Sequence, residues 1–493
     1  MAKVLTTGRP WRVILVFCIP LLIGNVVQQL YQVADALVVG RTLGVDSLAS
    51  VGAVGGLLFL LFGLAWGMTS GFAIPTAQAF GAGDPAAVRR SVATGTVLTA
   101  VASVVISVAA LLLAGPALRL LQTPPELYDE AYTFAWVSFA GAASTMFYNY
   151  LASVIRAIGD SRTPLAFLAL SCGLNIVLVL VLVGLAGRGV GGAALATVIS
   201  QAVSVVLCLS YVRRRVPVLH VGRADFRLRR TDVTEHLRLG IPLGFQSSVI
   251  AIGTLVVQLR LNELGADAVA AYTTAARVDG LAVALLASLG LAVSTFAAQN
   301  LGAGRGDRIR RGVVQGVWMS LAGALVLAVV LIAFGAQLVE LFVGPGEHEV
   351  VEMAALFLTV NGGMYVVLGV LFVLRGALQG IGQAAVPTLT GVVELVMRVG
   401  AALALGATFG YAGVVWSNPL AWLGAVLLLI PAYMKAHRAL AAVVPAASSG
   451  GAPEVEPVLV EGPAEGSLVV EAVLPLPRAP EQDASDDVPL PMR

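Results

Sequence analysis

The sequence predicts an all-α polytopic membrane protein with twelve transmembrane helices in two pseudo-symmetric six-helix bundles. Of its 493 residues, 58% are apolar and only 12% are charged, and the mean hydropathy is +0.90. A soluble domain carries about 25% charged residues. Two further observations specify the architecture: a series of apolar segments of membrane length, and a second half that repeats the first.

Twelve apolar segments are each long enough to cross a bilayer, which takes about 20 residues of helix. They cover residues 13–40, 50–80, 88–114, 128–157, 163–186, 190–212, 240–262, 268–299, 311–335, 350–378, 385–407 and 411–435. The first is much longer than the apolar part of a signal peptide and contains amides and an acid. We therefore expect it to remain as a span.

The second half of the chain repeats the first at an offset of 221 to 223 residues. Ile19–Leu21 matches Ile241–Leu243. Further along, Gln78–Gly83 matches Gln299–Gly304. Because each repeat has an even number of spans, both cross the membrane in the same sense, related by an axis along the membrane normal. Two such bundles with a central cleft are the usual basis of alternating access.

The repeat and the composition divide the chain into four parts. They are an N-terminal six-helix lobe (1–212), a basic cytoplasmic linker (213–239), a C-terminal six-helix lobe (240–438) and an acidic tail (439–493). The tail is rich in Pro, Ala, Gly and acid, so we expect it to be disordered. The linker has no pattern of stacking aromatic residues, and we expect it to lie on anionic lipid and not to bind nucleic acid.

The basic residues near the span ends predict the orientation. With the N-terminus and every second loop on one side, 22 Lys and Arg residues lie on that side and four on the other. Basic residues are retained on the cytoplasmic face. The sequence therefore predicts a multi-pass protein of the cell membrane with both termini in the cytoplasm.

Several classes of site are excluded or disfavoured. Lysine occurs only at Lys3 and Lys435, so no Gly-rich loop ends in Lys and a Walker A nucleotide site is excluded. Cys18, Cys172 and Cys208 lie inside apolar runs without metal-ligand spacing. The four histidines lie in loops or at span ends, and no nucleophile, base and orienting residue can be recognised. We expect no enzyme activity, no metal and no cofactor.

The first span carries a polar stripe through an apolar helix. At about 100° per residue, its members lie near one face: Asn25, Gln28, Gln32 and Asp35. An acid at membrane depth is tolerated mainly where it faces a water-filled cavity or a partner, and desolvation favours its neutral form. Asp35 is therefore the strongest candidate to bind a proton. Alternatively, it lies at the helix end and extends to the headgroups beside Arg41.

Other polar residues of the first half have two interpretations. Asn175 shares a face with Ser171 in the fifth span, and Thr197 and Gln201 lie on one stripe of the sixth. Such residues more often form interhelical hydrogen bonds than bind ligands. Tyr148 in the fourth span could line a cavity for an aromatic cation, or simply pack.

The second half contains four ionisable residues within its spans. Glu394 and Arg398 have the favourable i to i+4 order and predict an ion pair. Arg277 and Asp279 lie in the eighth span. Because ionisable residues inside a membrane often mark a transport pathway, these four form a second candidate site.

Two prolines and two amides complete the candidates. Pro20 and Pro242 occupy equivalent positions a few residues into their spans, where a missing backbone hydrogen bond permits a bend. Gln246 and Gln258 of the seventh span are further candidates to line a substrate cavity.

The chain resembles the multidrug and toxic compound extrusion (MATE) family, and most of all its DinF-like branch. Three motifs carry the resemblance. Asp35 follows Pro20 by fifteen residues, Gly-Ala-Gly loops follow spans two and eight, and Arg-Ala-Ile-Gly-Asp-Ser-Arg-Thr-Pro (156–164) follows span four. The resemblance covers about residues 10–438 and includes the parallel six-plus-six repeat.

The resemblance implies a V-shaped pair of lobes that exports organic cations and amphipathic compounds in exchange for protons or sodium ions. In the DinF-like pattern Asp35 is the coupling residue, assisted by Asn175 and Thr197. Many relatives have a second Asp four residues after that Asn, whereas this chain has Val179. A site with one carboxylate fewer binds sodium less well, which favours proton coupling.

Two rivals remain open. A flippase for lipid-linked saccharides, from the same superfamily, needs a cleft with several cationic residues to hold a pyrophosphate, and the spans of the first half offer no clear Arg. A membrane scaffold or receptor with a recruiting tail leaves the repeat and the polar stripe unexplained. We expect a monomer in the lipid bilayer that acts on small-molecule drugs.

Overall fold

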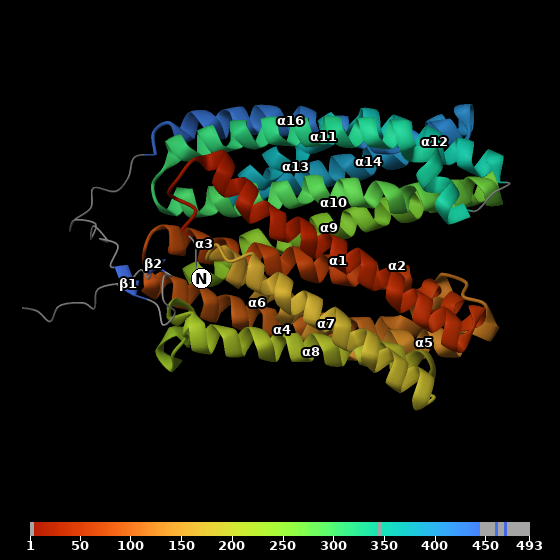
Figure 1. Ribbon diagram of the computed structural model, residues 1–493, viewed down its shortest axis with the longest axis horizontal. Helices are drawn as coiled ribbons and strands as arrows, with labels where there is room; N and C mark the ends of the chain where they lie inside the picture. Colours follow the sequence, from red (N-terminus) through yellow and green to blue (C-terminus); the bar gives the residue numbers. More distant parts are fainter. Residues whose placement is uncertain (1–3, 344–346, 444–458, 462–467, 471–493) are drawn as a thin grey trace, which may run out of the picture. The chain divides into compact units, whose positions relative to one another are not determined.

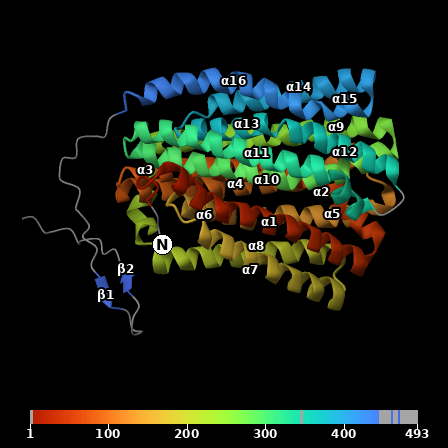
Figure 2. The same cartoon turned by 45° about the horizontal axis from the view of Figure 1, so that its top comes forward.

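Long helices with nearly parallel axes make up the membrane unit of the chain. The computed structural model describes residues 4–343, 347–443, 459–461 and 468–470. Figure 1 shows the helices side by side, and Figure 2 shows the same bundle turned by 45°. A helix satisfies its backbone polar groups internally, which lipid requires of any segment that crosses it.

The first half begins with a long helix and ends before the basic linker. Its elements are α1 (Pro10–Leu43), α2 (Val45–Phe72), α3 (Ile74–Gly81), α4 (Pro85–Leu120), α5 (Pro125–Ala140), α6 (Ala142–Ala157), α7 (Arg162–Val179), the π-helical η1 (Leu180–Leu185) and α8 (Gly189–Arg215). Proline stands in the first turn of α1, α4 and α5, where its missing N–H removes no helical hydrogen bond.

The second half repeats this order of helices. Its elements are α9 (Arg230–Leu264), α10 (Ala266–Gly302), α11 (Gly306–Val343), α12 (His348–Gly363), α13 (Tyr365–Gly380), α14 (Ala385–Phe409), α15 (Tyr411–Val415) and α16 (Ser417–Leu440). The broken pair α12–α13 begins and ends 223 residues after the pair α5–α6. The duplication seen in the sequence is therefore present in the helix boundaries.

A single glycine joins the first two helices of each half. Gly44 has φ +94° and Gly265 has φ +106°, both with extended ψ. Glycine alone adopts this conformation without strain, which explains its presence at both equivalent turns.

The number of clearly membrane-spanning helices is slightly lower than predicted. In the described residues, ten helices are long and apolar enough to cross a membrane, or eleven if α12 and α13, bent by 50°, form one span. The predicted span 128–157 corresponds to α5 and α6, which are 16 residues each and fall outside this count. The polar run Tyr148-Asn149-Tyr150 makes this segment less apolar than its equivalent.

The connection between the halves is shorter than the predicted linker. α8 extends to Arg215 and α9 begins at Arg230, so the connection takes up only about half of the predicted range 213–239. It contains two short 3-10 turns, η2 (Pro217–Leu219) and η3 (Arg223–Phe226). Both turns pack on α4.

The predicted disordered tail contains some regular structure. α16 continues to Leu440, and β1 (Leu459–Glu461) pairs antiparallel with β2 (Leu468–Val470). The remainder of the tail lies outside the described residues.

The first helix of the chain crosses between the two halves. Ile14 and Phe17, near the start of α1, belong to a hydrophobic core made mainly of α10–α13 and α16, together with Leu5 and Leu21. Near its other end, Val39 packs in the core of the first half. Figure 1 shows α1 running diagonally from the second-half helices toward those of the first half. The predicted N-terminal lobe therefore does not contain the whole of α1.

The equivalent helix α9 makes the reciprocal crossing. Leu239 and Leu243 pack in a first-half cluster that includes Phe72, whereas Val257 and Leu261 pack with second-half residues. Two of the exchanged side chains, Leu21 and Leu243, stand next to the two prolines predicted to permit bending. Both prolines lie inside continuous helices.

Glycines bring the backbones of the two halves into contact. A Cβ at Gly67 of α2 would lie 2.4 Å from the carbonyl oxygen of Leu243, and one at Gly71 would lie 2.6 Å from the Cα of Gly240. The spacing of these glycines is the small-xxx-small pattern of close helix pairs in membranes. Toward the other end of α2 the two helices are less closely packed, since a Cβ at Gly63 would lie 3.6 Å from the Cβ of Ser247 and one at Gly56 would lie 3.5 Å from a side-chain carbon of Leu255.

Two equivalent glutamines reinforce this end of the interface. Gln78 of α3 donates through Nε2 to the Gly380 carbonyl oxygen, at 2.9 Å. Gln299 of α10 donates to the Ala157 carbonyl oxygen, at 2.7 Å. Each glutamine thus bonds the other half of the molecule, and the two bonds are related by the repeat. The halves are held together at the end where α3 and the linker lie.

Replacing Gly67 with Ala should weaken the contact between the halves. The added methyl group overlaps backbone atoms that cannot rotate away, and overpacking of this kind costs about 1–3 kcal/mol. We expect a lower apparent unfolding temperature in detergent.

The matched control is Gly52→Ala on the same helix, where the space is open and the helix gains about 0.5–1 kcal/mol from the loss of Gly. An unfolding temperature for Gly67→Ala equal to or above that of Gly52→Ala would contradict the proposed packing.

Candidate functional site

A polar cluster joins α1, α7 and α8 inside the first half. Asn175 of α7 donates through Nδ2 to the hydroxyl of Thr197 on α8, at 3.1 Å. The Tyr31 hydroxyl of α1 lies 3.2 Å from the same oxygen. Thr197 donates in turn to the carbonyl oxygen of Ala193, at 3.3 Å. Thr197 therefore receives two donors and links the three helices.

Asp35 lies one helical turn after Tyr31 and has an unsatisfied oxygen. Its side chain is half-buried, and buried Oδ1 has no hydrogen-bond partner among the described residues. The buried amide oxygens of Asn175 and Gln201 likewise lack a described donor. A buried carboxyl oxygen without a donor is one that a bound proton would satisfy.

The structure brings together the predicted pair Asn175 and Thr197, and it adds Tyr31, which was not among the predicted residues. Neither Asn175 nor Thr197 hydrogen-bonds Asp35 in the described structure. The signal for Tyr31 was its position four residues before Asp35, which places both on one helix face.

The other predicted first-half residues are placed less favourably for binding. Gln28 is exposed, and the side chain of Gln32 lies outside the described residues. Tyr148 is buried and its hydroxyl donates to the Pro164 carbonyl oxygen, at 3.3 Å. This bond favours the packing interpretation of Tyr148.

A second intramembrane acid is hydrogen-bonded in the second half. The Tyr365 hydroxyl donates to Oδ1 of buried Asp279, at 2.6 Å. Nearby on α10, Arg277 is exposed and lines a cavity of about 690 Å³ with Asn262, Thr273 and Thr274. Arg277 has no ion-pair partner among the described residues.

The ion pair of the second half differs from the predicted one. Glu394 of α14 pairs with Arg375 of α13, and the Arg375 guanidinium also donates to Thr390, at 3.4 Å. Arg398 forms no described ion pair, and its buried Nε lacks a described partner. Arg375, which lies near the end of the predicted span 350–378, is buried inside α13.

The predicted amides of α9 are both hydrogen-bonded. Gln246 is buried and accepts from Nε2 of Gln379, at 3.1 Å, while its own Nε2 has no described partner. Gln258 donates to Asn262, at 2.9 Å, beside the cavity that contains Arg277.

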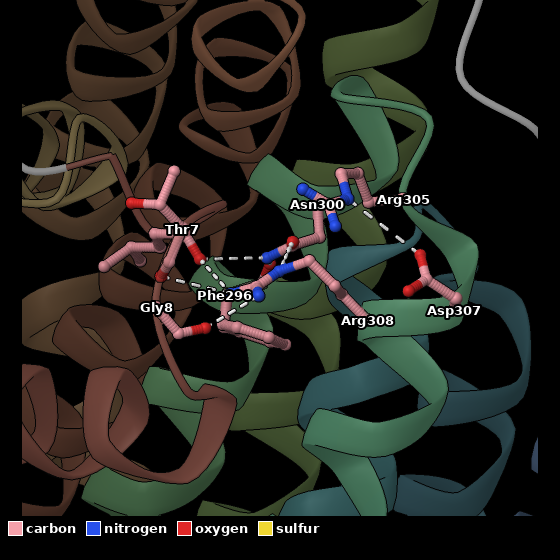
Figure 3. A network of polar contacts seen from close by, with 8 residues as sticks. Thr7, Gly8, Phe296, Asn300, Arg305, Asp307 and Arg308 are labelled. Carbon is pink, nitrogen blue, oxygen red and sulfur yellow. Dashed lines mark hydrogen bonds and ion pairs between the residues drawn. The ribbon is translucent and has the colours of Figure 1, made fainter.

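An N-terminal segment (residues 4–9) is bound to the second half. It lies at the end of the bundle where the halves are held together, near α3 and the linker, which we call the closed end. Buried Arg308 of α11 donates to the carbonyl oxygens of Gly8 at 2.8 Å, Thr7 at 3.2 Å and Leu5 at 3.4 Å, and to Asn300 at 2.9 Å. Figure 3 shows the guanidinium of Arg308 between Asn300 and this segment.

The same glutamine that joins the halves also holds this segment. Oε1 of Gln299 accepts from the Leu5 amide at 2.8 Å, while its Nε2 donates to Ala157 of α6. The N-terminal segment, α10 and α6 thus meet at one buried side chain.

A duplicated helical bundle with unpaired or isolated ionisable groups inside it is the architecture of a secondary transporter. The MatE family model matches residues 20–181 and 242–424, one match in each half, and the chain belongs to this family. The resemblance to the MATE family is confirmed.

Relatives and solved structures agree with this assignment. The chain is 30% identical over 389 residues to the probable multidrug resistance protein YoeA of Bacillus subtilis (strain 168). The aligned region covers 78% of this chain and 84% of the relative. It is 28% identical over 381 residues to YpnP, a probable multidrug resistance protein of the same strain, covering 76% and 84%.

A solved MATE family transporter, described in an outward-facing conformation, has the same fold. The TM-score is 0.82 at 24% identity, and the match covers 89% of this chain and 98% of the solved one.

Replacing Arg308 with Ala should release the N-terminal segment. Three hydrogen bonds from a charged group to the segment are lost, and each contributes about 1.5–3 kcal/mol. Amide exchange at Leu5 should become at least about tenfold faster, as measured by hydrogen–deuterium exchange.

Arg305→Ala is the control, because Arg305 is partly exposed and lies 4.0 Å from Asp307 without contacting the segment. Equal exchange rates in the two variants would show that Arg308 does not hold the segment.

Proposed function

We propose that the protein is a multidrug efflux antiporter of the cytoplasmic membrane, which exports organic cations and amphipathic compounds in exchange for protons. The observation that carries the proposal is Asp35, a half-buried acid with an unsatisfied oxygen beside the Tyr31–Thr197–Asn175 cluster. The relatives named as multidrug resistance proteins support the substrate class.

The pattern of contacts between the halves supports alternating access. The halves touch through glycine backbones and the two glutamine bonds at one end, whereas toward the other end α2 and α9 are less closely packed and a cavity lies beside Gly265. Because the closed end carries most of the basic residues, it faces the cytoplasm. The contacts at this end have to break for substrate to enter from inside.

Protons are the coupling ion in this proposal, with sodium as the alternative. A bound cation gains most from several charged oxygen ligands. The position where many relatives have a second Asp is Val179, whose side chain is fully buried and apolar. Asp35 then offers the one carboxylate of the cluster, which suffices for a proton.

The proposed cycle follows from the two protonation states of Asp35. In the outward-facing state a proton from outside neutralises the carboxylate, and attraction to a bound cation weakens, so the drug leaves. After the inward change the proton is released to the cytoplasm and the charged site receives drug again. The differential affinity of the two protonation states drives the shift in population. A single chain contains both halves, so we propose that it acts as a monomer.

The second half gives some support to a flippase for lipid-linked saccharides. Arg277 lines a cavity and has no ion-pair partner among the described residues, so its positive charge is available to an anionic headgroup. In contrast, Arg375 is neutralised by Glu394. Among the described residues that line this cavity, Arg277 is the one cation, fewer than a pyrophosphate needs.

Replacing Asp35 with Asn should abolish proton-driven export. Asn mimics the neutral form and cannot exchange a proton. The measurement is export of a fluorescent organic cation from purified protein in liposomes, with a proton gradient and a sodium gradient imposed separately, and we expect at least about a tenfold loss.

The control is Asp46→Asn, an exposed acid in the first turn of α2, which should transport like the wild type. Sodium-driven export by the wild type would contradict proton coupling. No export under either gradient would favour the flippase.

A further inference from the structure

A basic cavity lies at the closed end of the bundle, away from the candidate transport site. Its volume is about 400 Å³, and it lies where α11 begins and α16 ends. The lining residues are Asp307, Arg310, Arg311, Val314, Gln315 and His437. None of the intramembrane residues assigned to transport contributes to it.

The charges in this cavity are suited to an anion. Arg310 donates through Nε to Nε2 of His437, at 2.9 Å, so this histidine nitrogen is an acceptor and Arg310 keeps its remaining N–H groups for a ligand. Arg311 is exposed and has no ion-pair partner among the described residues. Two arginines against the single acid Asp307 leave the described lining with a net positive charge.

An apolar face continues from the cavity along α11. Val314 is 47% exposed, Trp318 is 68% exposed and Leu325 is 61% exposed, at spacings of four and seven residues that keep them on one side of the helix. In a helix that crosses a membrane, such a face contacts lipid chains, and tryptophan is enriched at the level of the headgroups.

The start of α1 borders the same cavity. The Trp11 amide donates to Oε1 of Gln315, a lining residue, at 2.9 Å. Trp11 is itself 41% exposed. The cavity is open to the surface and is lined by the first turns of α11 and the last turn of α16, with the first turn of α1 beside it.

We propose that this cavity binds the phosphate of an anionic phospholipid, with the acyl chains lying along the exposed face of α11. Guanidinium groups match phosphate oxygens in charge and geometry. Basic recesses between helices at the cytoplasmic surface are suited to acidic headgroups. A bound headgroup joins α11 to α16, both of the second half, beside the attachment of α1.

The test is binding of defined lipids to the full-length protein in detergent. Native mass spectrometry counts bound phosphatidylglycerol and phosphatidylcholine of equal chain length, and the thermal unfolding shift gives an independent readout. We expect at least one tightly bound phosphatidylglycerol, and at least about tenfold weaker binding in the double variant Arg310→Gln/Arg311→Gln.

The control is Arg213→Gln/Arg214→Gln, which removes two adjacent exposed arginines from the last turn of α8, and which should bind the lipid as the wild type does. A charge-preserving variant, Arg310→Lys/Arg311→Lys, should retain the preference for phosphatidylglycerol and show that the protein is folded.

Three results would overturn the proposal. The first is equal loss of binding in the control and the double variant, which would indicate general surface charge. The second is equal binding of phosphatidylcholine. The third is the same thermal shift with inorganic phosphate alone, which would identify a site for the free anion in place of a lipid.

Discussion

The reciprocal exchange of first helices between the halves is the constraint on which the rest of the structure depends. α1 begins in the core of the second half and α9 begins in the core of the first. Glycines allow the backbones of α2 and α9 to touch where α9 enters the first half, and the bonds of Gln78 and Gln299 close the same end. Any separation of the halves at this end has to move the first part of both helices.

This arrangement connects the candidate coupling residue to the closed end. Asp35 lies beyond Pro20 in the part of α1 that packs in the first half, while the part before the proline is fixed to the second half by Leu5, Phe17 and the bonds of Arg308. A change of charge at Asp35 therefore acts on a helix that both halves hold. The proline permits the bend that relative motion of the halves requires.

The sequence predicted the helices and the duplication well, because apolar length and a repeat are local properties of the chain. It also placed Asn175 beside Thr197, since the family pattern supplied their pairing. It could not predict that α1 crosses between halves, because the apolar composition of a helix does not specify which other helices it packs against. The partner of Glu394 was predicted wrongly for a similar reason. The i to i+4 spacing identifies only partners on the same helix, such as Arg398, whereas the observed partner Arg375 lies on another helix.

The measurement that tests this account most directly is the distance between the halves at both ends of the molecule. Spin labels at the equivalent residues Asp46 and Asp267 report on one end, and labels at Ala82 and Ala303 report on the other, after replacement of the three buried cysteines. Lowering the pH should change the two distances in opposite directions in the wild type and leave both unchanged in Asp35→Asn. Distances that stay constant in the wild type, or that respond equally in Asp35→Asn, would contradict the account.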